Sequence, residues 1–170
     1  MKYLFLSFLL GLLGVVACSP RTAQTEGNTE VSKSIDTTVI ISPSTERKVI
    51  YTEKAPKPVG PYSQAIFKNN TLYVAGQLGI DPKTGLLVGD SIDVQTRQAL
   101  ENIKVIVEEA GLKLSDVVQT TVYLKNINDF NKMNKVYATY FGGISPARAT
   151  IEVAAIPLKA KVEIVAVAAK

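Results

Sequence analysis

Residues 145–157, SPARATIEVAAIP, combine small and β-branched side chains and carry one arginine, Arg148, near their start. Such a run is typical of a β-strand. A guanidinium presents a rigid fork of N–H donors that fits a carboxylate in a bidentate pair, so Arg148 is a candidate receptor for an anionic group. A solvated charge at the beginning of a strand would give the same pattern, and this stretch alone leaves both interpretations open.

The composition excludes several kinds of chemistry. The chain of 170 residues has no histidine and one cysteine, Cys18. If Cys18 lies outside the folded domain, that domain has no usual zinc ligands, no Ser-His-Asp or Cys-His mechanism and no internal disulfide. Any catalysis must then come from carboxylates, Arg, Lys, Tyr, hydroxyls, backbone groups and water. The net charge of +4 is modest, and the sequence has no dense block of Lys and Arg. We therefore expect no nucleic-acid partner.

The N-terminus has the layout of a secretory signal. Residues 1–18, MKYLFLSFLLGLLGVVAC, contain one lysine, an apolar run that is short for a membrane span, and then small residues. The ending VVAC resembles a bacterial lipobox, in which cleavage leaves Cys18 as the acylated first residue. We therefore expect a lipoprotein signal peptide over residues 1–17 and an exported chain, anchored in the membrane through Cys18 and facing the periplasm or in the outer membrane. An ordinary signal peptide with an incidental cysteine is the alternative.

Two further segments follow the predicted signal. Residues 18–46 are rich in Ser, Thr, Asn and Glu and poor in large apolar side chains, which predicts a flexible polar tether. The hydrophobic pattern becomes regular from about Arg47, which predicts a folded domain over residues 47–170.

The pattern of the domain predicts an α+β fold. Strands are expected over 48–53, over 65–79 as a pair around the turn at Asn69 and Asn70, and over 116–126, 149–155 and 161–168; helices are expected over 91–111 and 128–142. The order of strands, helix, strand, helix and strands predicts two helices on one face of a mixed sheet. The other sheet face has no evident helical cover, which favours an oligomer that buries it.

The closing segment also carries a family resemblance. PARATIEVAAI, then five residues and VEI (146–164), resembles the signature of the RidA family, also called YjgF, the reactive-intermediate deaminases. Further agreement lies in GPYSQA (60–65), LYVAGQLGIDPKTG (72–85), the segment 95–130 and MNKVYATYF (133–141). The resemblance covers the chain from Lys48 to its end. It implies a homotrimer of the chorismate-mutase-like fold, with ligand sites in the clefts between subunits.

The family resemblance also implies an activity and a set of site residues. The activity is hydrolysis of 2-imino and enamine acids, such as 2-aminoacrylate, 2-iminopropanoate and 2-iminobutanoate, to 2-oxo acids and ammonia, without a cofactor. Arg148 has the position of the arginine that grips the substrate carboxylate, and Glu163 that of the glutamate associated with the attacking water. The implied substrate-binding positions are Tyr62, Gly76, Asn134 and Thr150.

Two positions depart from many members of the family. Ala75 stands where many have serine, so a hydroxyl that could help to hold the ligand is absent. Thr150 stands where many have cysteine, and it keeps a hydroxyl. These differences bear on substrate range more than on fold.

The proposed chemistry requires little machinery. An imine conjugated to a carboxylate is electrophilic, so its hydrolysis needs a grip on the carboxylate and a positioned water. A plain hairpin of the last two predicted strands would, however, separate Arg148 from Glu163 by roughly 25 Å. We therefore expect either a different strand pairing or a site completed across a subunit boundary.

Other interpretations remain open at this point. Taken without the family, Glu163 would be a solvent-facing strand residue, Tyr62 a turn aromatic and Asn134 a helix-surface residue. Reactive imino acids arise mainly in the cytoplasm, whereas this chain is expected to be exported. The alternative function is therefore a non-enzymatic trimeric module that binds small carboxylates at the cell envelope. An RNA-cleaving activity, ascribed to some relatives, fits less well with export and the lack of a basic groove.

Overall fold

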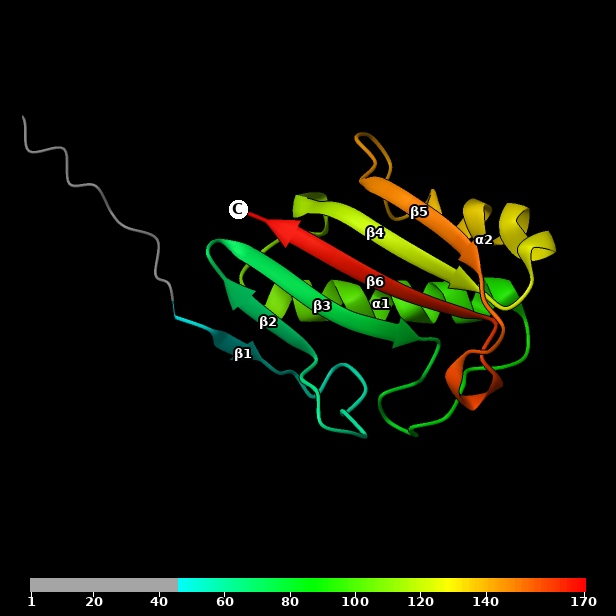
Figure 1. Cartoon of the computed structure of the whole chain (residues 1–170), viewed down its shortest axis with the longest axis horizontal. Helices are drawn as coiled ribbons and strands as arrows, with labels where there is room; N and C mark the ends of the chain where they lie inside the picture. Colours follow the sequence, from blue (N-terminus) through cyan, green and yellow to red (C-terminus); the bar gives the residue numbers. More distant parts are fainter. Residues whose placement is uncertain (1–45) are drawn as a thin grey trace, which may run out of the picture. The chain divides into compact units, whose positions relative to one another are not determined.

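The computed structural model describes residues 46–170. The expected signal peptide (1–17), the lipidation site Cys18 and the tether up to residue 45 lie outside the described residues. The described part contains a six-stranded sheet with the order β1-β2-β3-β6-β4-β5 and two α-helices (Figure 1).

The first three strands are antiparallel neighbours. They are β1 (Lys48–Ile50), β2 (Ala65–Lys68) and β3 (Thr71–Leu78). Between β2 and β3, Asn69 and Asn70 have φ values of 50° and 58°. Two left-handed residues in a two-residue loop are the geometry that matches the twist of a hairpin, and asparagine tolerates it. The predicted hairpin is therefore confirmed, whereas β1 ends three residues before the predicted limit.

The pairing of the last two strands differs from a hairpin. β6 (Val162–Ala169) lies between β3 and β4 (Val117–Leu124) and is antiparallel to both. β5 (Ala147–Glu152) lies at the sheet edge, parallel to β4. The parallel pair is possible because α2 (Phe130–Tyr137) lies in the connection from β4 to β5, as in a βαβ unit. The expectation of a different pairing from a plain hairpin is thus confirmed.

The first helix agrees closely with the sequence pattern. α1 (Ile92–Glu109) lies within the predicted helix and buries Leu100, Ile103 and Val107, whose spacing of three and four residues places them on one helical face. Gly111, with φ of +77°, follows the C-cap residue Ala110 in the left-handed conformation that ends many helices. Three short 3₁₀ helices complete the fold: η1 (Leu114–Asp116), η2 (Ile127–Asp129) and η3 (Pro157–Lys159).

The second helix is shorter than predicted. It ends at Tyr137 rather than near residue 142. After it, the backbone N–H of Thr139 donates to Val136 and that of Tyr140 donates to Tyr137. These are tighter, i to i−3 turns, which commonly close a helix. The tightening leads the chain into the loop that ends at Pro146, just before β5.

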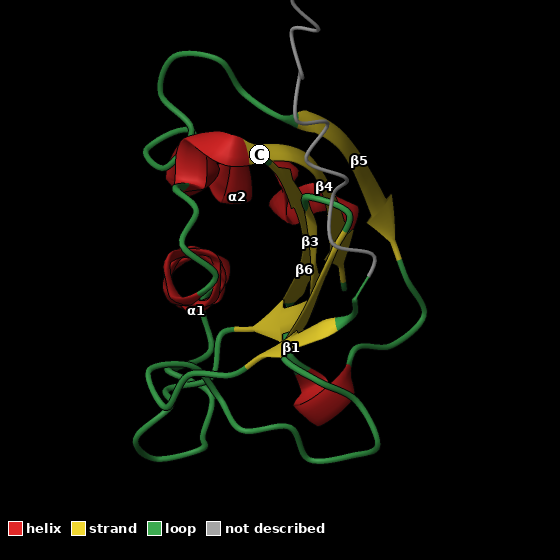
Figure 2. Cartoon of the chain, turned by 90° about the vertical axis from the view of Figure 1, so that its left-hand side faces the viewer, coloured by secondary structure: helices red, strands yellow, loops and turns green. Residues whose placement is uncertain are grey.

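Both α-helices cover the same face of the sheet, as predicted (Figure 2). The largest fully buried apolar side chains between the two layers are Leu72, Leu100, Ile103, Ile106, Leu124, Met133 and Ile164. On the opposite face of the sheet, which we call the open face, Tyr73 is 53% exposed and Ile151 is 47% exposed. Within residues 46–170, no helix combines the length and the apolar character needed to cross a membrane.

Candidate functional site

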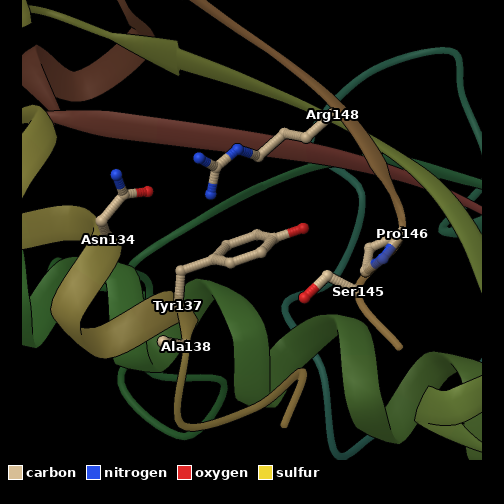
Figure 3. A pocket seen from close by; sticks show the side chains of 6 residues that line it. All are labelled: Asn134, Tyr137, Ala138, Ser145, Pro146 and Arg148. Atoms are coloured by element: carbon tan, nitrogen blue, oxygen red, sulfur yellow. The ribbon is translucent and has the colours of Figure 1, made fainter. Parts of the chain in front are cut away.

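Arg148 is positioned by β5 and faces the second helix. In the parallel register it lies beside Thr120 of β4, whose side chain is buried under the helices. The guanidinium carbon Cζ lies 4.5 Å from the centroid of the Tyr137 ring and 5.7 Å from that of Phe130. Figure 3 shows the guanidinium over the Tyr137 ring. Arg148 therefore leans on aromatic rings on the helix side of the sheet.

A pocket opens beside this guanidinium. It has a volume of about 410 Å³ and is lined by Asn134, Tyr137, Ala138, Ser145, Pro146 and Arg148. The side chain of Asn134 comes from α2, one turn before Tyr137, and its amide lies near the guanidinium in Figure 3. The fold thus brings together two of the residues expected at a ligand site, Arg148 and Asn134. The pocket therefore has the N–H donors of a guanidinium and the oxygen of a side-chain amide.

The charge of Arg148 is not balanced by an acid in the described part of the chain. The ion pair recorded within residues 46–170 joins Lys161 to Asp90, with 3.3 Å between Nζ and Oδ1. No carboxylate of these residues forms an ion pair with Arg148. A structural carboxylate would occupy the donors of the guanidinium, so its absence within 46–170 leaves those donors free for a ligand.

Thr150 lies two residues after Arg148 on the same strand, and therefore on the same face of the sheet. Its hydroxyl oxygen Oγ1 is buried and has no hydrogen-bond partner among the described residues. Thr150 does not line the pocket described above. A buried hydroxyl without a partner is uncommon, so this oxygen is a polar group that an additional molecule could satisfy.

Glu163 and Gly76 form a second group on neighbouring strands. Between Val74 and Gln77 the register of β3 with β6 shifts, so that Ala75 and Gly76 together oppose Val165. At this bulge, the Glu163 carboxylate lies against Gly76, in the space that a Cβ would occupy. Glu163 is half-buried, and burial raises the pKa of its carboxyl above the ordinary value. A carboxylate with a raised pKa is a stronger base than a solvated one.

Tyr62 lies in the loop between β1 and β2, with 52% of the residue exposed. Its hydroxyl accepts a hydrogen bond of 3.3 Å from the backbone N–H of Val59. Two residues later, the carbonyl of Gln64 accepts from the N–H of Ala75 in the bulge. This bond ties the Tyr62 loop to the strand segment that carries Gly76. Within one chain, Tyr62 does not line the Arg148 pocket.

The two groups lie on opposite faces of the sheet. Thr120 of β4 is level with Arg148 and faces the helices, where its hydroxyl meets that of Tyr137 at 2.7 Å. Tyr123 of β4 is level with Glu163. Because side chains alternate along a strand, positions 120 and 123 point to opposite faces. Within one chain, Arg148 thus faces the helices and Glu163 the open face, and the two do not share a site.

Sequence reasoning missed Tyr137 as a site residue. Tyr137 falls in the predicted second helix at a position typical of a core residue, and it is buried. A tyrosine that supports a guanidinium and one that fills a core give the same apolar periodicity. The signal that could have separated them is the short connection from this helix to the strand that carries Arg148.

Comparison with known proteins agrees with this fold. Residues 52–170 match the protein family described as endoribonuclease L-PSP. The chain belongs to this family. A relative from Pyrococcus horikoshii, named as a RutC family protein, is 58% identical over 124 residues, which cover 73% of this chain and 98% of the relative. The predicted family of the domain is therefore confirmed.

Two further members of the L-PSP family bear on activity and fold. A human relative, named 2-iminobutanoate/2-iminopropanoate deaminase, is 48% identical over 122 residues, covering 72% of this chain and 89% of the relative. The crystal structure of the E. coli YjgF gene product superposes with a TM-score of 0.70 at 44% identity, covering 72% of this chain and 98% of that one. The YjgF-like α+β fold expected from the sequence is thus confirmed.

Proposed function

We propose that this chain is a hydrolase that converts small 2-imino acids to 2-oxo acids and ammonia. The observation that carries the proposal is Arg148, whose guanidinium borders a pocket and has no acidic partner within residues 46–170. Its in-plane donors fit the carboxylate that every 2-imino acid carries. The deaminase name of the human relative supports the same class of reaction.

The proposed substrates are 2-iminopropanoate, 2-iminobutanoate and the enamine 2-aminoacrylate, which becomes 2-iminopropanoate when its methylene carbon is protonated. Water adds to the imine carbon, and one of its protons passes to the imine nitrogen, which gives a carbinolamine. The hydroxyl proton then passes to the same nitrogen while the C=O bond forms, the C–N bond breaks and ammonia leaves. The products are the 2-oxo acid and ammonia, which balance the imine and one water. No cofactor takes part in these steps.

Glu163 is the proposed base for the water. Burial raises the pKa of its carboxyl, which makes the carboxylate a stronger base towards water than a fully solvated one. In this proposal Gly76 provides the space in which the carboxylate lies. Asn134 contributes its amide to the ligand, while Tyr62 and Thr150 line the remaining part of the site.

We further propose a homotrimer in which the active site is shared between chains. Arg148 and Glu163 face opposite sides of one sheet, so a single chain supplies only one of them to any cleft. In the proposed trimer, the open face of one copy, which carries Glu163, lies against the Arg148 pocket of its neighbour. The exposed Tyr73 and Ile151 on the open face support burial of this surface by another copy.

The test is an imine-trapping assay with purified protein. An amino-acid oxidase generates 2-iminopropanoate or 2-iminobutanoate, and semicarbazide traps the imine that has not been hydrolysed. Wild type is expected to lower the trapped fraction, and Arg148→Ala to reduce this effect by about 100-fold because the carboxylate grip orients the substrate. Arg97→Ala, at an exposed arginine of α1, is the matched control.

The same assay separates the two candidate functions. If wild type leaves the trapped fraction unchanged, the hydrolase proposal is wrong. Binding of 2-oxo acids without turnover would then favour the non-enzymatic carboxylate-binding module.

For the N-terminal region we propose export and anchoring of the chain in the membrane through a lipid on Cys18. This proposal rests on the sequence of residues 1–18. Fractionation of cells that express wild type or Cys18→Ser tests it, together with metabolic labelling by a fatty acid. Wild type is expected to be labelled and to appear in the membrane fraction. Cys18→Ser is expected to carry no label. An unlabelled wild type would contradict the anchor.

A further inference from the structure

Arg148 is held by aromatic rings instead of by an acid. Its Cζ lies 4.5 Å from the Tyr137 centroid and 5.7 Å from the Phe130 centroid, and a cation within about 6 Å of a ring face is attracted by the ring. A ring contact of this kind uses the flat face of a guanidinium, whereas its N–H donors lie in the plane. The rings can therefore hold the side chain through its flat face. One donor also interacts with the Tyr137 hydroxyl, and the other N–H donors remain available to a carboxylate.

Tyr137 is itself held in a fixed place. It is only 5% exposed, and its ring packs against Phe141 with 4.6 Å between centroids. Its hydroxyl shares a 2.7 Å hydrogen bond with the hydroxyl of Thr120. Thr120 is the residue that lies beside Arg148 in the β4–β5 register. The phenol and the guanidinium are therefore both tied to the same pair of strands.

The phenol does not compete for the charge of Arg148. Burial raises the pKa of Tyr137 above its ordinary value of 10.0, although the hydrogen bond with Thr120, the charge of Arg148 and a side-chain hydrogen bond with Arg148 act in the opposite direction. The group therefore stays protonated around neutral pH. A neutral ring supports the cation without neutralising it, so the charge remains available to a ligand.

We propose that Tyr137 is a positioning residue, which fixes the plane of the Arg148 guanidinium so that its N–H edge faces the pocket and binds a carboxylate. Asn134, one turn earlier on α2, lies at this edge of the pocket. The inference rests on the proposed function in taking Arg148 as the carboxylate receptor. It does not depend on the water-activating role of Glu163.

The test compares two ligands that differ only in the group that Arg148 would bind. Calorimetry measures the dissociation constants of 2-oxobutanoate and of its neutral amide, 2-oxobutanamide, for wild type, Tyr137→Leu and Tyr137→Phe. Tyr140→Leu is the matched control: Tyr140 follows Tyr137 by one turn, and its hydroxyl donates to Glu101 at 2.7 Å. None of the contacts recorded for residues 46–170 joins Tyr140 to Arg148.

Tyr137→Leu is expected to weaken binding of the oxo acid by about tenfold and binding of the amide much less, because the ring lines the pocket for both ligands but supports the cation only for the carboxylate. Tyr137→Phe restores most of the loss, since it keeps the ring and removes only the hydroxyl. Tyr140→Leu leaves the ratio of the two constants as in wild type. In turnover, Tyr137→Leu is expected to raise KM more than it lowers kcat.

A second variant guards against misfolding of Tyr137→Leu. Thr120→Val keeps the Tyr137 ring and nearly the shape of residue 120. It removes the Thr120 hydroxyl that forms the hydrogen bond with the Tyr137 phenol. A smaller loss of affinity, confined to the oxo acid, is expected. In an Arg148→Ala background, neither substitution should change the ratio further, because residues that act through one group are not additive.

Three results would overturn the inference. They are equal loss of affinity for both ligands in Tyr137→Leu and Thr120→Val, no loss in either variant, or a wild type that does not distinguish the oxo acid from the amide. A wild type that prefers the oxo acid but does not lower the trapped imine defeats the proposed hydrolase alone, and leaves the role of Tyr137 standing. The two failures are therefore distinguishable.

Discussion

The carboxylate of Glu163 occupies the place where a side chain at Gly76 would lie. A Cβ at position 76 would overlap Oε1 of Glu163 and approach its Cδ to 2.8 Å. The contact joins β6 to the bulge of β3, where Ala75 and Gly76 oppose one residue. The bulge and the missing side chain together create the space in which the carboxylate rests against the backbone.

Gly76→Ala should therefore displace the carboxylate while leaving the fold largely intact. The atoms in conflict are the far end of a flexible side chain, so the cost in unfolding free energy is expected to stay within about 1 kcal/mol. Turnover should fall by about 10-fold or more, because a displaced base no longer reaches the water. Thermal unfolding and the imine-trapping assay measure the two effects.

Gly79→Ala provides the contrast. A Cβ there would lie 2.5 Å from the Cα and 2.8 Å from the carbonyl oxygen of Gln95, which belong to the backbone of α1. Since a helix backbone cannot swing aside, this variant should lose several kcal/mol of stability. Equal stability losses in Gly76→Ala and Gly79→Ala would contradict the account of position 76.

The stability of the protein should depend on pH through Glu163. Burial raises its carboxyl pKa above the ordinary value of 4.5, so the folded chain binds this proton more tightly than the unfolded chain. The stabilisation of the folded state by the protonated carboxyl is fully present below the ordinary pKa. It is lost as the pH rises through the higher pKa of the folded state. Glu163→Gln should thus have a higher Tm than wild type at about pH 7, with the difference shrinking towards pH 4.

The same substitution should abolish turnover, since an amide does not accept the proton of water. In wild type, kcat/KM should fall as the pH is lowered through a value above 4.5, where Glu163 becomes protonated. A Tm for Glu163→Gln that equals wild type at all pH values would argue against an ionised, desolvated carboxylate at this position.

Mixed oligomers test whether the site is shared between chains. Arg148→Ala and Glu163→Gln are each expected to be inactive. If each site takes Arg148 from one chain and Glu163 from its neighbour, one site in three of a mixed trimer has both residues intact, so purified mixed trimers should regain about a third of the wild-type activity. Co-expression with two affinity tags, followed by tandem purification and the trapping assay, measures this recovery. No recovery in verified mixed oligomers would exclude a shared site.

Thr150→Val should separate a binding role from a structural one. The buried Oγ1 has no hydrogen-bond partner within residues 46–170, so its replacement by a methyl group should raise the unfolding free energy by about 1 kcal/mol. If a ligand supplies the missing partner, the same variant should bind 2-oxobutanoate more weakly. Greater stability with unchanged affinity would remove Thr150 from the site.

Local patterns predicted the elements of this fold well. The two asparagines at 69 and 70 specified the hairpin turn, and the apolar spacing of α1 together with Gly111 specified a helix and its end. These features depend on residues close in sequence. The pairing of β5 with β4 instead of β6 depends on long-range contacts, and strand periodicity is the same for either partner.

The pairing of β5 with β4 also separates the predicted site residues into two groups. Arg148 and Asn134 meet at one pocket, and Gly76 and Glu163 touch in another part of the sheet. The family resemblance named all four, but only the strand register showed that they form two groups on opposite faces. The role of Tyr137 escaped prediction because a buried helical tyrosine has many uses.

The parallel edge strand has a practical consequence for protein engineering. Residues 134–146 shape the wall around the Arg148 guanidinium, whereas the proton acceptor is built from β3 and β6. If Arg148 grips the substrate and Glu163 activates the water, as proposed, then substrate preference and reaction chemistry are encoded in separate stretches of the polypeptide. Libraries that vary the helix–strand connection would then alter the preference for bulkier or more polar acids and leave the proposed base, Glu163, unchanged.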